Sequence, residues 1–550
     1  MPDISVFIGG QAGEGIKRGA MVIGKAFNRF GYHIFIMNDY GSIIRGGQDY
    51  SEVRISSVEP GSQAGFADFF FAYHKDVYER YLNRVKEEGV TFLEGAGVNQ
   101  IPYERILKEN NAKPFMRSSI VLGVLSYMTK LPFEIVEEVM INEFKDKAYT
   151  NIELARKGFQ YVRENHFPIR PIPEGDKMPL PIMYGNDAIA LGGVKVGMKV
   201  YAAYPITPTS TLLDFLAMNA KRLGISVIHA EDEIAAIMMG IGASYASAPV
   251  MVGSSGPGID LMGEAISLSG GAEVPIVIVD VQRGGPTTGM PTYTEQSDLF
   301  LSLSIGHGEF PRIVLAPGSV EEAFEMTIRA FQYAYWYQTP VIVLSDKHLS
   351  ESAKSVSIPF SEEYMLPLKY FEGGGDYKRY KITDDGISPL AFPGMEGIVN
   401  HTNSTEHMED GYSTAIPESV KLMKDKRIRK QETIREDFMY EENTHFYGNP
   451  DDGNLIIASG STKGAIMESI KGLPVNFLQI LTLEPFPVES VKEIMSRARN
   501  VIVVEENSTG QLADIIRSRT GVEISKRILK YDGRPFDPVV LRKDIEEVIG

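Results

Sequence analysis

Near-continuous apolar segments between residues 183 and 355 restrict the fold of this chain more than any other feature. Six such segments, KVYAAYPI, ISVIHA, APVMVGSS, EVPIVIVDV, RIVLA and PVIVLSD, alternate with helical patterns such as DEIAAIMMGIGASYA. Strands that are apolar on both faces are typical of a parallel sheet that helices cover on both sides. Ligands of such sheets bind beyond the carboxyl ends of the strands. We therefore predict an α/β fold and expect the functional residues where these strands end.

Alternating strand and helix patterns also occur on either side of this region, and changes of composition divide the chain. Prolines in NHFPIRPIPEGDKMPLPI interrupt helix and strand patterns alike and predict a boundary. Residues 356–450 are rich in Gly, Asp, Glu, Lys and Tyr and end in a charged helical pattern, which favours a solvated linker without chemistry. The predicted parts are residues 1–170, residues 183–355, an insertion with a connecting helix at 356–450, and a last α/β module at 451–550.

The composition excludes several classes of function for this chain. Its 550 residues include no cysteine, which removes disulfides, thiolate nucleophiles and cysteine-ligated iron-sulfur clusters. Any redox reaction would need a second chain to carry the electrons. The formal net charge of −17 argues against nucleic acid or an anionic membrane as the main partner. The N-terminal sequence has no signal-peptide pattern and no apolar stretch approaches about 20 residues, so we expect a cytoplasmic location and no membrane segment.

The segment YPITPTS follows a long apolar strand and places hydroxyl groups at the strand end. Each proline favours an extended conformation for the residue before it, so Tyr204 and Thr207 are held outside the helical region. Thr209 or Ser210 can then cap the following helix. Thr207 would present a free hydroxyl at the edge of the sheet. A rigid turn with a helix cap, and no ligand, explains the same residues.

Three acidic residues, Glu231, Asp232 and Glu233, follow the next strand in HAEDEIAAIMMG. Acidic side chains in the first turn of a helix complement its dipole, so ordinary capping accounts for Glu231 and Asp232. Glu233 precedes an apolar run and enters the core, where a carboxylate needs a dedicated partner. Glu233 is therefore a candidate functional group.

Two further strand ends carry candidate residues. Arg283, in QRGGPTTGMPT, follows an apolar strand and precedes two glycines, and its planar guanidinium suits a carboxylate. A buried structural ion pair is the alternative for this arginine. In GSSGPG, Ser255 and Gly256 stand where the backbone can approach a ligand closely.

The N-terminal segment ISVFIGGQAGEGIKRG predicts a strand, a glycine-rich turn and a helix. Backbone N–H groups in such a turn can bind a phosphate over the helix N-terminus. The pattern is not GxGxxG, and glycines in strand-to-helix turns also occur for packing alone. From the residues themselves, both interpretations stay open.

Taken together, YPITPTS, AEDEIAAI, GSSGPG and QRGGPTTGMPT resemble the α subunit of 2-oxoacid:ferredoxin oxidoreductases. GGQAGEGI and GSIIRGGQDYSEVRIS resemble the γ domain of the same family, here fused ahead of the α part, and the likeness extends over essentially the whole chain. The resemblance implies a γ domain, a parallel-sheet domain that binds the pyrimidine end of thiamine diphosphate, and a C-terminal α/β domain like that of transketolase.

The resemblance also implies an activity, the oxidative decarboxylation of 2-oxoglutarate, pyruvate or both to CO2 and an acyl-CoA. Thiamine diphosphate would be the cofactor, coenzyme A the co-substrate and ferredoxin the electron acceptor. By the same resemblance, Glu233 hydrogen-bonds N1′ of the aminopyrimidine and so promotes removal of the C2 proton. Arg283 would hold the substrate carboxylate, and Thr207 a keto or carboxylate oxygen. Further residues implied are Tyr204, Ile206, Ser255 and Gly256 at thiamine diphosphate, and Gly9, Gly10, Gln11 and Arg45 at coenzyme A.

Two elements of a complete active site are missing from the sequence. There is no GDG motif for magnesium and diphosphate, and there are no cysteines for an iron-sulfur cluster. The resemblance therefore implies a β subunit that supplies both, no metal site in this chain, and an α2β2 assembly. Acidic ferredoxin is expected to dock on that β subunit, because this chain is itself acidic.

Other functions fit parts of the sequence. A relative that acts on indolepyruvate or branched-chain 2-oxoacids is the nearest alternative, although the fused layout favours 2-oxoglutarate or a broad substrate range. A nucleotide-binding scaffold would use the four loops without chemistry. A free-standing enzyme is disfavoured by the missing GDG motif.

Overall fold

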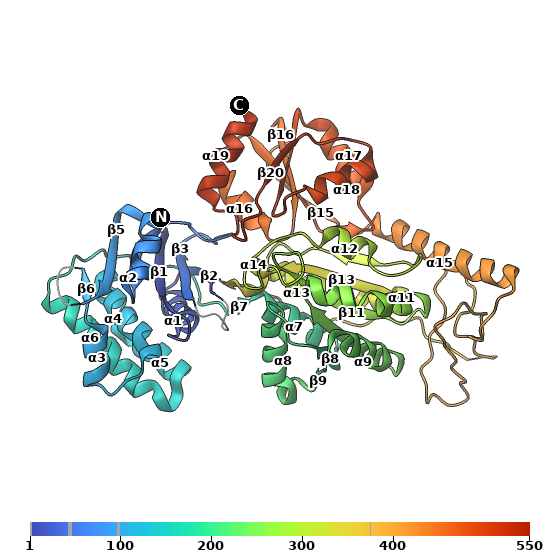
Figure 1. Cartoon of the computed structure of the whole chain (residues 1–550), viewed down its shortest axis with the longest axis horizontal. Coiled ribbons are helices and arrows are strands. Elements are labelled where there is room, and N and C mark those ends of the chain that lie inside the picture. The colour runs from blue at the N-terminus through green and yellow to red at the C-terminus, as the bar shows by residue number, and fades with distance from the viewer. Residues whose placement is uncertain (1–2, 42–46, 96–98, 374–375, 451) are drawn as a thin grey trace.

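The computed structural model describes residues 3–41, 47–95, 99–373, 376–450 and 452–550. The strands in these residues form three sheets, and helices pack against each of them (Figure 1). In this view one sheet lies at the left, a second in the middle, and the third, which is nearest the C-terminus, above the second. None of the helices in the described ranges is long and apolar enough to cross a membrane. The α/β fold class predicted from the sequence is confirmed.

The first sheet is mixed. Strands β1, β4, β5 and β6 are joined by parallel pairs, whereas β3, β2, β14 and β7 are joined by antiparallel pairs. In spatial order the strands are β6 (Gln100–Ile101), β5 (Val85–Glu94), β4 (Ala67–Ala72), β1 (Asp3–Gln11), β3 (Gln48–Ser56), β2 (His33–Asp39), β14 (Ala353–Ser355) and β7 (Ile182–Tyr184). The helices of this part are α1 (Ile16–Arg29), α2 (Lys75–Tyr81), α3 (Tyr103–Glu109), α4 (Arg117–Thr129), α5 (Phe133–Phe144) and α6 (Ala148–Glu164), with short 3-10 turns at Leu82–Arg84, Pro114–Met116 and Lys145–Lys147. Helix α1 buries Ile16, Ala20, Ile23 and Phe27, which are three or four residues apart and so lie on one face against the sheet.

Two strands of the first sheet come from later parts of the chain. β7 begins one residue before the region 183–355 and β14 ends at its last residue, and both pair in the first sheet rather than the second. The hydrogen bond from the backbone N–H of Ile34 to the hydroxyl of Ser355, at 2.9 Å, adds to this attachment. The four-part division of the chain stays a proposal, because the two strands at the limits of the region 183–355 pair with the sheet of the first region.

The middle sheet contains the apolar segments from which the fold was predicted. In spatial order its strands are β18 (Thr482–Glu484), β12 (Ile313–Leu315), β13 (Pro340–Asp346), β11 (Ile276–Gln282), β10 (Val250–Ser254), β8 (Val200–Ala203) and β9 (Ser226–His229). All pairs are parallel except that of β18 with β12. The helices are α7 (Gly185–Lys195), α8 (Ser210–Leu223), α9 (Glu233–Tyr245), α10 (Gly256–Leu261), α11 (Gly263–Gly271), α12 (Leu299–Ser304), α13 (Val320–Tyr337) and α14 (Lys347–Glu351). Every residue of β10, β11 and β13 is buried, as expected for strands covered on both faces.

The third sheet shares its core with the middle one. Its strands, in spatial order, are β15 (Thr444–Tyr447), β17 (Val475–Ile480), β16 (Asn454–Ser459), β19 (Asn500–Glu505) and β20 (Lys526–Leu529), and its helices are α16 (Thr462–Ser469), α17 (Val488–Arg497), α18 (Gln511–Thr520) and α19 (Pro538–Ile549). Leu455 and Leu478 of this sheet belong to the same buried apolar cluster as Ile278 and Ile342 of the middle sheet. The continuous core holds the third sheet over the loops of the middle one.

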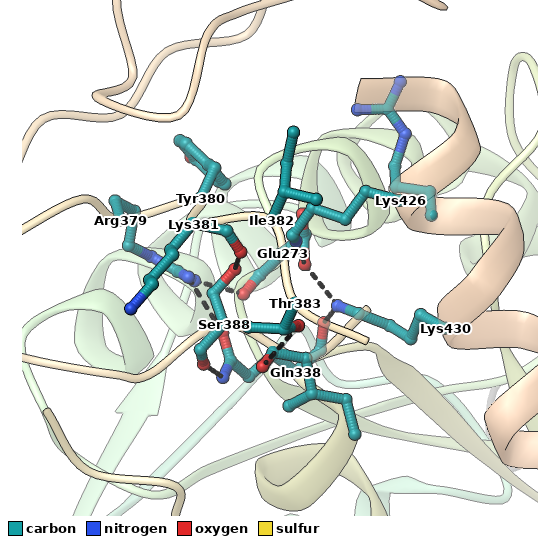
Figure 2. A network of polar contacts seen from close by, with 12 residues as sticks. Glu273, Gln338, Arg379, Tyr380, Lys381, Ile382, Thr383, Ser388, Lys426 and Lys430 are labelled. Atoms are coloured by element: carbon teal, nitrogen blue, oxygen red, sulfur yellow. Dashed lines mark hydrogen bonds and ion pairs between the residues drawn. The ribbon is translucent and has the colours of Figure 1, made fainter. Parts of the chain in front are cut away.

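The insertion and its helix α15 (Pro417–Phe438) pack on the middle sheet through buried charges (Figure 2). Lys426 donates to Glu273 at 2.6 Å, and Lys430 also donates to this carboxylate. Arg379 of the insertion donates to the side chain of Gln338 at 2.8 Å and to the backbone of Glu273. Burial alone would raise the pKa of Glu273, but the three cations hold it well below its usual range. The interpretation of this helix as a solvated connector is therefore wrong for the face that carries Lys426 and Lys430, both of which are fully buried.

Removing the buried negative charge at this contact is expected to destabilise the chain strongly. Glu273→Gln would leave Lys426 and Lys430 buried without their shared counter-charge, which typically costs about 3–5 kcal/mol in the free energy of unfolding. Urea denaturation of the variant would measure this loss. As a control, Glu409→Gln removes a carboxylate whose partner, Lys378, is half exposed, and it should leave the stability nearly unchanged. Equal effects of the two substitutions would contradict a structural role for the buried charges.

Candidate active site

Four loops of the sequence meet at one edge of the middle sheet. Strands β11, β10, β8 and β9 are neighbours in this order and run parallel, so their carboxyl ends lie at the same edge. The loops that follow these four strands are the segments QRGGPTTGMPT, GSSGPG, YPITPTS and AEDEIAAI. The tertiary structure thus brings together the four segments that the sequence singled out, at the edge where parallel sheets bind ligands.

Thr207 stands in the loop between β8 and α8 and is half-buried. Its backbone carbonyl accepts a hydrogen bond of 2.6 Å from Nη1 of Arg283. Thr209 precedes α8, but its side chain makes no cap; the hydroxyl donates instead to the carbonyl of Ser254 at 2.6 Å. The helix-cap prediction for Thr209 is therefore wrong, because this hydroxyl ties the loops after β8 and β10 together.

Arg283 immediately follows β11 and is only 7% exposed. Its Nε is buried and has no hydrogen-bond partner among the described residues, and no carboxylate of those residues lies within 4.0 Å of its guanidinium. Burial lowers the pKa of Arg283, while Asp298 and Glu233 raise it, so two carboxylates face this guanidinium from a distance. Arg283 is therefore a buried cation with an unused N–H donor. This favours the interpretation that it binds an anionic ligand over the alternative of a structural ion pair.

Glu233 is the first residue of α9 and is 6% exposed. Asp232 caps the helix, since its side chain accepts from the backbone N–H of Ala235 at 2.7 Å, as the sequence predicted. Glu233 is thereby free of the capping role. A Cβ atom on Gly258 would lie 2.6 Å from Oε1 of Glu233 and 2.1 Å from the hydroxyl of Ser254, so only glycine leaves room for both side chains.

The remaining predicted cofactor contacts lie in the loops that follow β8 and β10. The hydroxyls of Ser254 and Ser255 are buried and have no hydrogen-bond partner within the part of the chain that the structure describes. Gly256 begins α10, whereas Tyr204 is exposed at the rim of the site and Ile206 is half-buried. Buried polar groups normally find partners, so these two hydroxyls indicate a site for a polar ligand.

Two carboxyl groups at the same edge, one buried and one half-buried, were not found from the sequence. Asp280 lies within β11 and Asp298 precedes α12, and burial raises the pKa of both, that of Asp298 to about 7. A charged residue inside the apolar segment EVPIVIVDV was the available signal for Asp280. Asp298 carried no such signal, because nothing in its local sequence places it beside Arg283.

Gly9 and Gly10 lie in β1 itself, before the glycine-rich turn, and other side chains pack against both. A Cβ on Gly9 would lie 2.5 Å from Val77, and one on Gly10 would lie 2.7 Å from a carboxylate oxygen of Glu14. The backbone N–H of Gln11 donates to Glu14 at 2.9 Å. Packing therefore explains both glycines, and the predicted contacts with coenzyme A stay a prediction. Arg45, the fourth residue of that prediction, lies outside the described residues.

A large cavity lies where the three sheets meet. It has a volume of about 740 Å3 and is lined by residues from the end of β2, from α14, from the loop after β11, and from the segment after β20. Its charged lining is mixed and consists of Arg80, Arg84, Lys347, Lys530, Arg534, Asp39, Asp532, Asp537 and Asp544. The cavity thus adjoins the carboxyl edges of both the first and the middle sheet.

The face of α9 beside Glu233 is apolar and exposed. Ile234 and Met238 lie one turn apart on this helix and are 51% and 44% exposed. Tyr204 and Leu261, on the adjoining elements, are exposed as well. Large apolar side chains that gather next to a buried carboxylate are typical of a surface that a partner covers.

Comparisons with known proteins show which family this chain is similar to. The family model described as "Pyruvate flavodoxin/ferredoxin oxidoreductase, thiamine diP-bdg" matches residues 192–425, and the model "Pyruvate ferredoxin/flavodoxin oxidoreductase" matches residues 5–161. The 2-oxoglutarate synthase subunit KorA of Methanocaldococcus jannaschii is 32% identical and covers 60% of this chain and 89% of its own length.

Several relatives match over nearly the whole chain, among them the following two. The α subunit of 2-oxoacid:ferredoxin oxidoreductase 2 from Aeropyrum pernix is 33% identical over 98% of this chain and 96% of its own. A solved structure of 2-oxoglutarate:ferredoxin oxidoreductase from Magnetococcus marinus, with 2-oxoglutarate, coenzyme A and succinyl-CoA bound, has a TM-score of 0.91 and 32% identity and covers 100% of both chains. With this extent of similarity, and four loops assembled at one sheet edge, the chain belongs to the family of 2-oxoacid:ferredoxin oxidoreductase α subunits.

Proposed function

We propose that this chain is the α subunit, with a fused γ domain, of an enzyme that oxidatively decarboxylates 2-oxoglutarate, pyruvate or both. The products would be CO2 and an acyl-CoA, and ferredoxin would accept the electrons. One observation carries the proposal: the edge of the middle sheet presents a buried guanidinium, Arg283, and a buried carboxylate, Glu233, beside two hydroxyls without partners. The 2-oxoglutarate bound to the similar enzyme of Magnetococcus marinus favours that substrate among the 2-oxoacids.

Arg283 and Thr207 would bind the substrate. The guanidinium would take the carboxylate of the 2-oxoacid, for which its unpartnered Nε is available. The hydrogen bond from Arg283 to the carbonyl of Thr207 fixes the two residues relative to each other, so the hydroxyl of Thr207 could reach a keto or carboxylate oxygen of the same molecule. Binding by two fixed groups would orient the carbon that reacts.

Thiamine diphosphate fits the polar groups around Glu233. The carboxylate would accept a hydrogen bond from N1′ of the aminopyrimidine and favour the protonation state that removes the C2 proton, a task that low solvent exposure assists. Tyr204, Ile206, Ser255 and Gly256 would enclose the pyrimidine end, and the free hydroxyl of Ser255 supports this assignment. When bound, the cofactor supplies the nucleophilic carbon that makes loss of CO2 possible.

A β subunit would complete the active site. The absence of cysteine and of a GDG motif from the sequence supports a partner that holds magnesium, the diphosphate and the iron-sulfur cluster. The exposed apolar face of α9 next to Glu233 would be part of the contact. We infer an α2β2 assembly in the cytoplasm, with ferredoxin docking on the β subunit because this chain has a net charge of −17.

Coenzyme A would reach the active edge of the middle sheet from the side of the first sheet. The cavity at the junction of the three sheets supports this, since it adjoins the active edge and includes cationic side chains such as Arg84 and Arg534 that suit phosphate groups. Gly9, Gly10, Gln11 and Arg45 remain candidates for the same ligand. Glu14 would have to leave the backbone of Gln11 before a phosphate could take its place.

The proposal is tested by anaerobic reduction of a viologen dye by the complex purified from its native source. We expect reduction that requires both a 2-oxoacid and coenzyme A, with the highest rate for 2-oxoglutarate among 2-oxoglutarate, pyruvate, indolepyruvate and a branched-chain 2-oxoacid. Preference for one of the last two would identify the alternative substrate class. No reduction by a complex shown to contain thiamine diphosphate and iron would favour the nucleotide-binding scaffold instead.

A further inference from the structure

The carboxyl groups of Asp280 and Asp298 lie beside the proposed substrate site and have no role in it so far. Both oxygens of Asp280 and one oxygen of Asp298 are buried without a hydrogen-bond partner in the described ranges. An ionised carboxylate that is buried without a donor is strongly disfavoured relative to its protonated form. Burial accordingly raises the pKa of both carboxyl groups.

Hydrogen bonding and packing fix Asp298 close to Arg283. Its backbone N–H donates to the side chain of Gln282 at 3.0 Å, and Gln282 in turn donates to the carbonyl of Ser345 at 3.1 Å. The carboxyl group of Asp298 packs on the backbone of Gly256, where an added Cβ would lie 2.6 Å from Oδ2. Asp298 is thus held between the turn at Gly256 and the end of β11, which carries Arg283.

The charges around Asp298 come from three neighbouring elements. Glu295 stands in the same loop, Asp260 in α10, and Asp280 and Arg283 at the end of β11. Burial, then Glu295 and Asp260, raise the pKa of Asp298 to about 7 against the opposing effect of Arg283. Burial and Asp298 raise the pKa of Asp280 well above its usual range. The pKa of Asp298 lies in the neutral range, so the charge of this group changes there.

We propose that Asp298 is a positioning residue that sets how strongly Arg283 attracts the carboxylate of the 2-oxoacid. This inference rests on the proposed binding of that carboxylate by Arg283. When Asp298 is protonated, the full charge of the guanidinium is available to the substrate. When Asp298 is ionised, its negative charge offsets that of Arg283 and repels the incoming anion. Binding of the 2-oxoacid is then accompanied by uptake of one proton from solvent by Asp298, without any covalent change.

The test measures KM for 2-oxoglutarate and kcat of the assembled complex between pH 6 and pH 9, with viologen as the electron acceptor. In the unmodified enzyme we expect KM to rise about tenfold over this range as Asp298 ionises near neutral pH. Asp298→Asn and Asp298→Ser cannot ionise, so their KM should depend far less on pH. Asp298→Glu restores an ionisable group and should restore the rise.

Control variants separate the effect of Asp298 from that of its neighbours. Asp260→Asn removes an exposed carboxylate that raises the pKa of Asp298, so it should move the rise of KM to lower pH without abolishing it. Asp280→Asn leaves Asp298 able to ionise, so the rise of KM with pH should remain. A pH-independent KM in the unmodified enzyme, or an unchanged rise in both non-ionisable variants at Asp298, would overturn this inference and leave the proposed function standing. Absence of any 2-oxoacid-dependent reduction at every pH would overturn both.

Discussion

Glu233→Gln in the assembled complex is expected to lower kcat for 2-oxoacid-dependent viologen reduction by about 10²–10⁴-fold, the usual contribution of a positioned acid–base group. The substitution keeps the shape of the side chain but removes its ability to accept a proton. The carboxylate is 6% exposed and is free of helix capping, and its charge acts on Arg283 from beyond ion-pair distance, so the substitution breaks no ion pair. Stopped-flow reduction assays with saturating 2-oxoglutarate and coenzyme A would measure the effect.

The neighbouring Glu231→Gln is the matched control for this experiment. Glu231 is exposed and lies two residues earlier in the same segment, so its loss should leave kcat within about twofold of the unmodified enzyme. Bound thiamine diphosphate would be quantified in both variants, because a variant without the cofactor is inactive for a different reason. Full activity of Glu233→Gln with the cofactor bound would remove Glu233 from the proposed chemistry.

Arg283→Ala should lower kcat/KM for 2-oxoglutarate by about 10²-fold or more, chiefly through a higher KM, while thiamine diphosphate still binds. Removal of one partner of a buried charge pair typically weakens the binding free energy by about 2–5 kcal/mol. Arg283→Lys keeps the charge but not the planar pair of donors, so it should recover only part of the loss. Steady-state kinetics and the Kd of thiamine diphosphate, measured on the same preparations, distinguish substrate binding from cofactor binding.

Arg222→Ala provides a control for the removal of a cationic side chain. Arg222 is exposed near the end of α8, away from the loops that follow the strands. Its loss should change neither the KM for 2-oxoglutarate nor the Kd of thiamine diphosphate. If Arg283→Ala has the KM of the unmodified enzyme, the guanidinium does not bind the substrate, and the proposal for Asp298 fails with it. If it loses the cofactor instead, Arg283 has a structural role in the site.

The sequence was sufficient to predict the middle sheet and the loops that form the candidate site. Segments such as EVPIVIVDV and PVIVLSD are apolar throughout, and only strands buried on both faces have this composition. Parallel strands place their carboxyl ends at one edge, so residues that follow separate strands, such as Thr207 and Arg283, were expected to meet there. The hydrogen bond of 2.6 Å between these two residues agrees with that expectation.

Local sequence was a poor guide where burial depends on distant partners. The helix PESVKLMKDKRIRKQETIREDF has the composition of a solvated helix, yet Lys426 and Lys430 are buried against Glu273. Nothing within the helix distinguishes these two lysines from their exposed neighbours, because their counter-charge lies more than 150 residues away in the chain. A charged side chain is buried only where such a partner meets it.

The sequence by itself thus determined the α/β architecture and the edge at which function is expected, because apolar strands and strand-end residues act through local geometry. Only the tertiary structure decided that Asp298 lies near Arg283, that Asp280 is fully buried in β11, and that Glu14 accepts a hydrogen bond from the backbone of Gln11. The charge state of such groups depends on solvent exclusion and on charges a few ångströms away. Those neighbours come from separate strands and helices, so their effects appear only after the chain has folded.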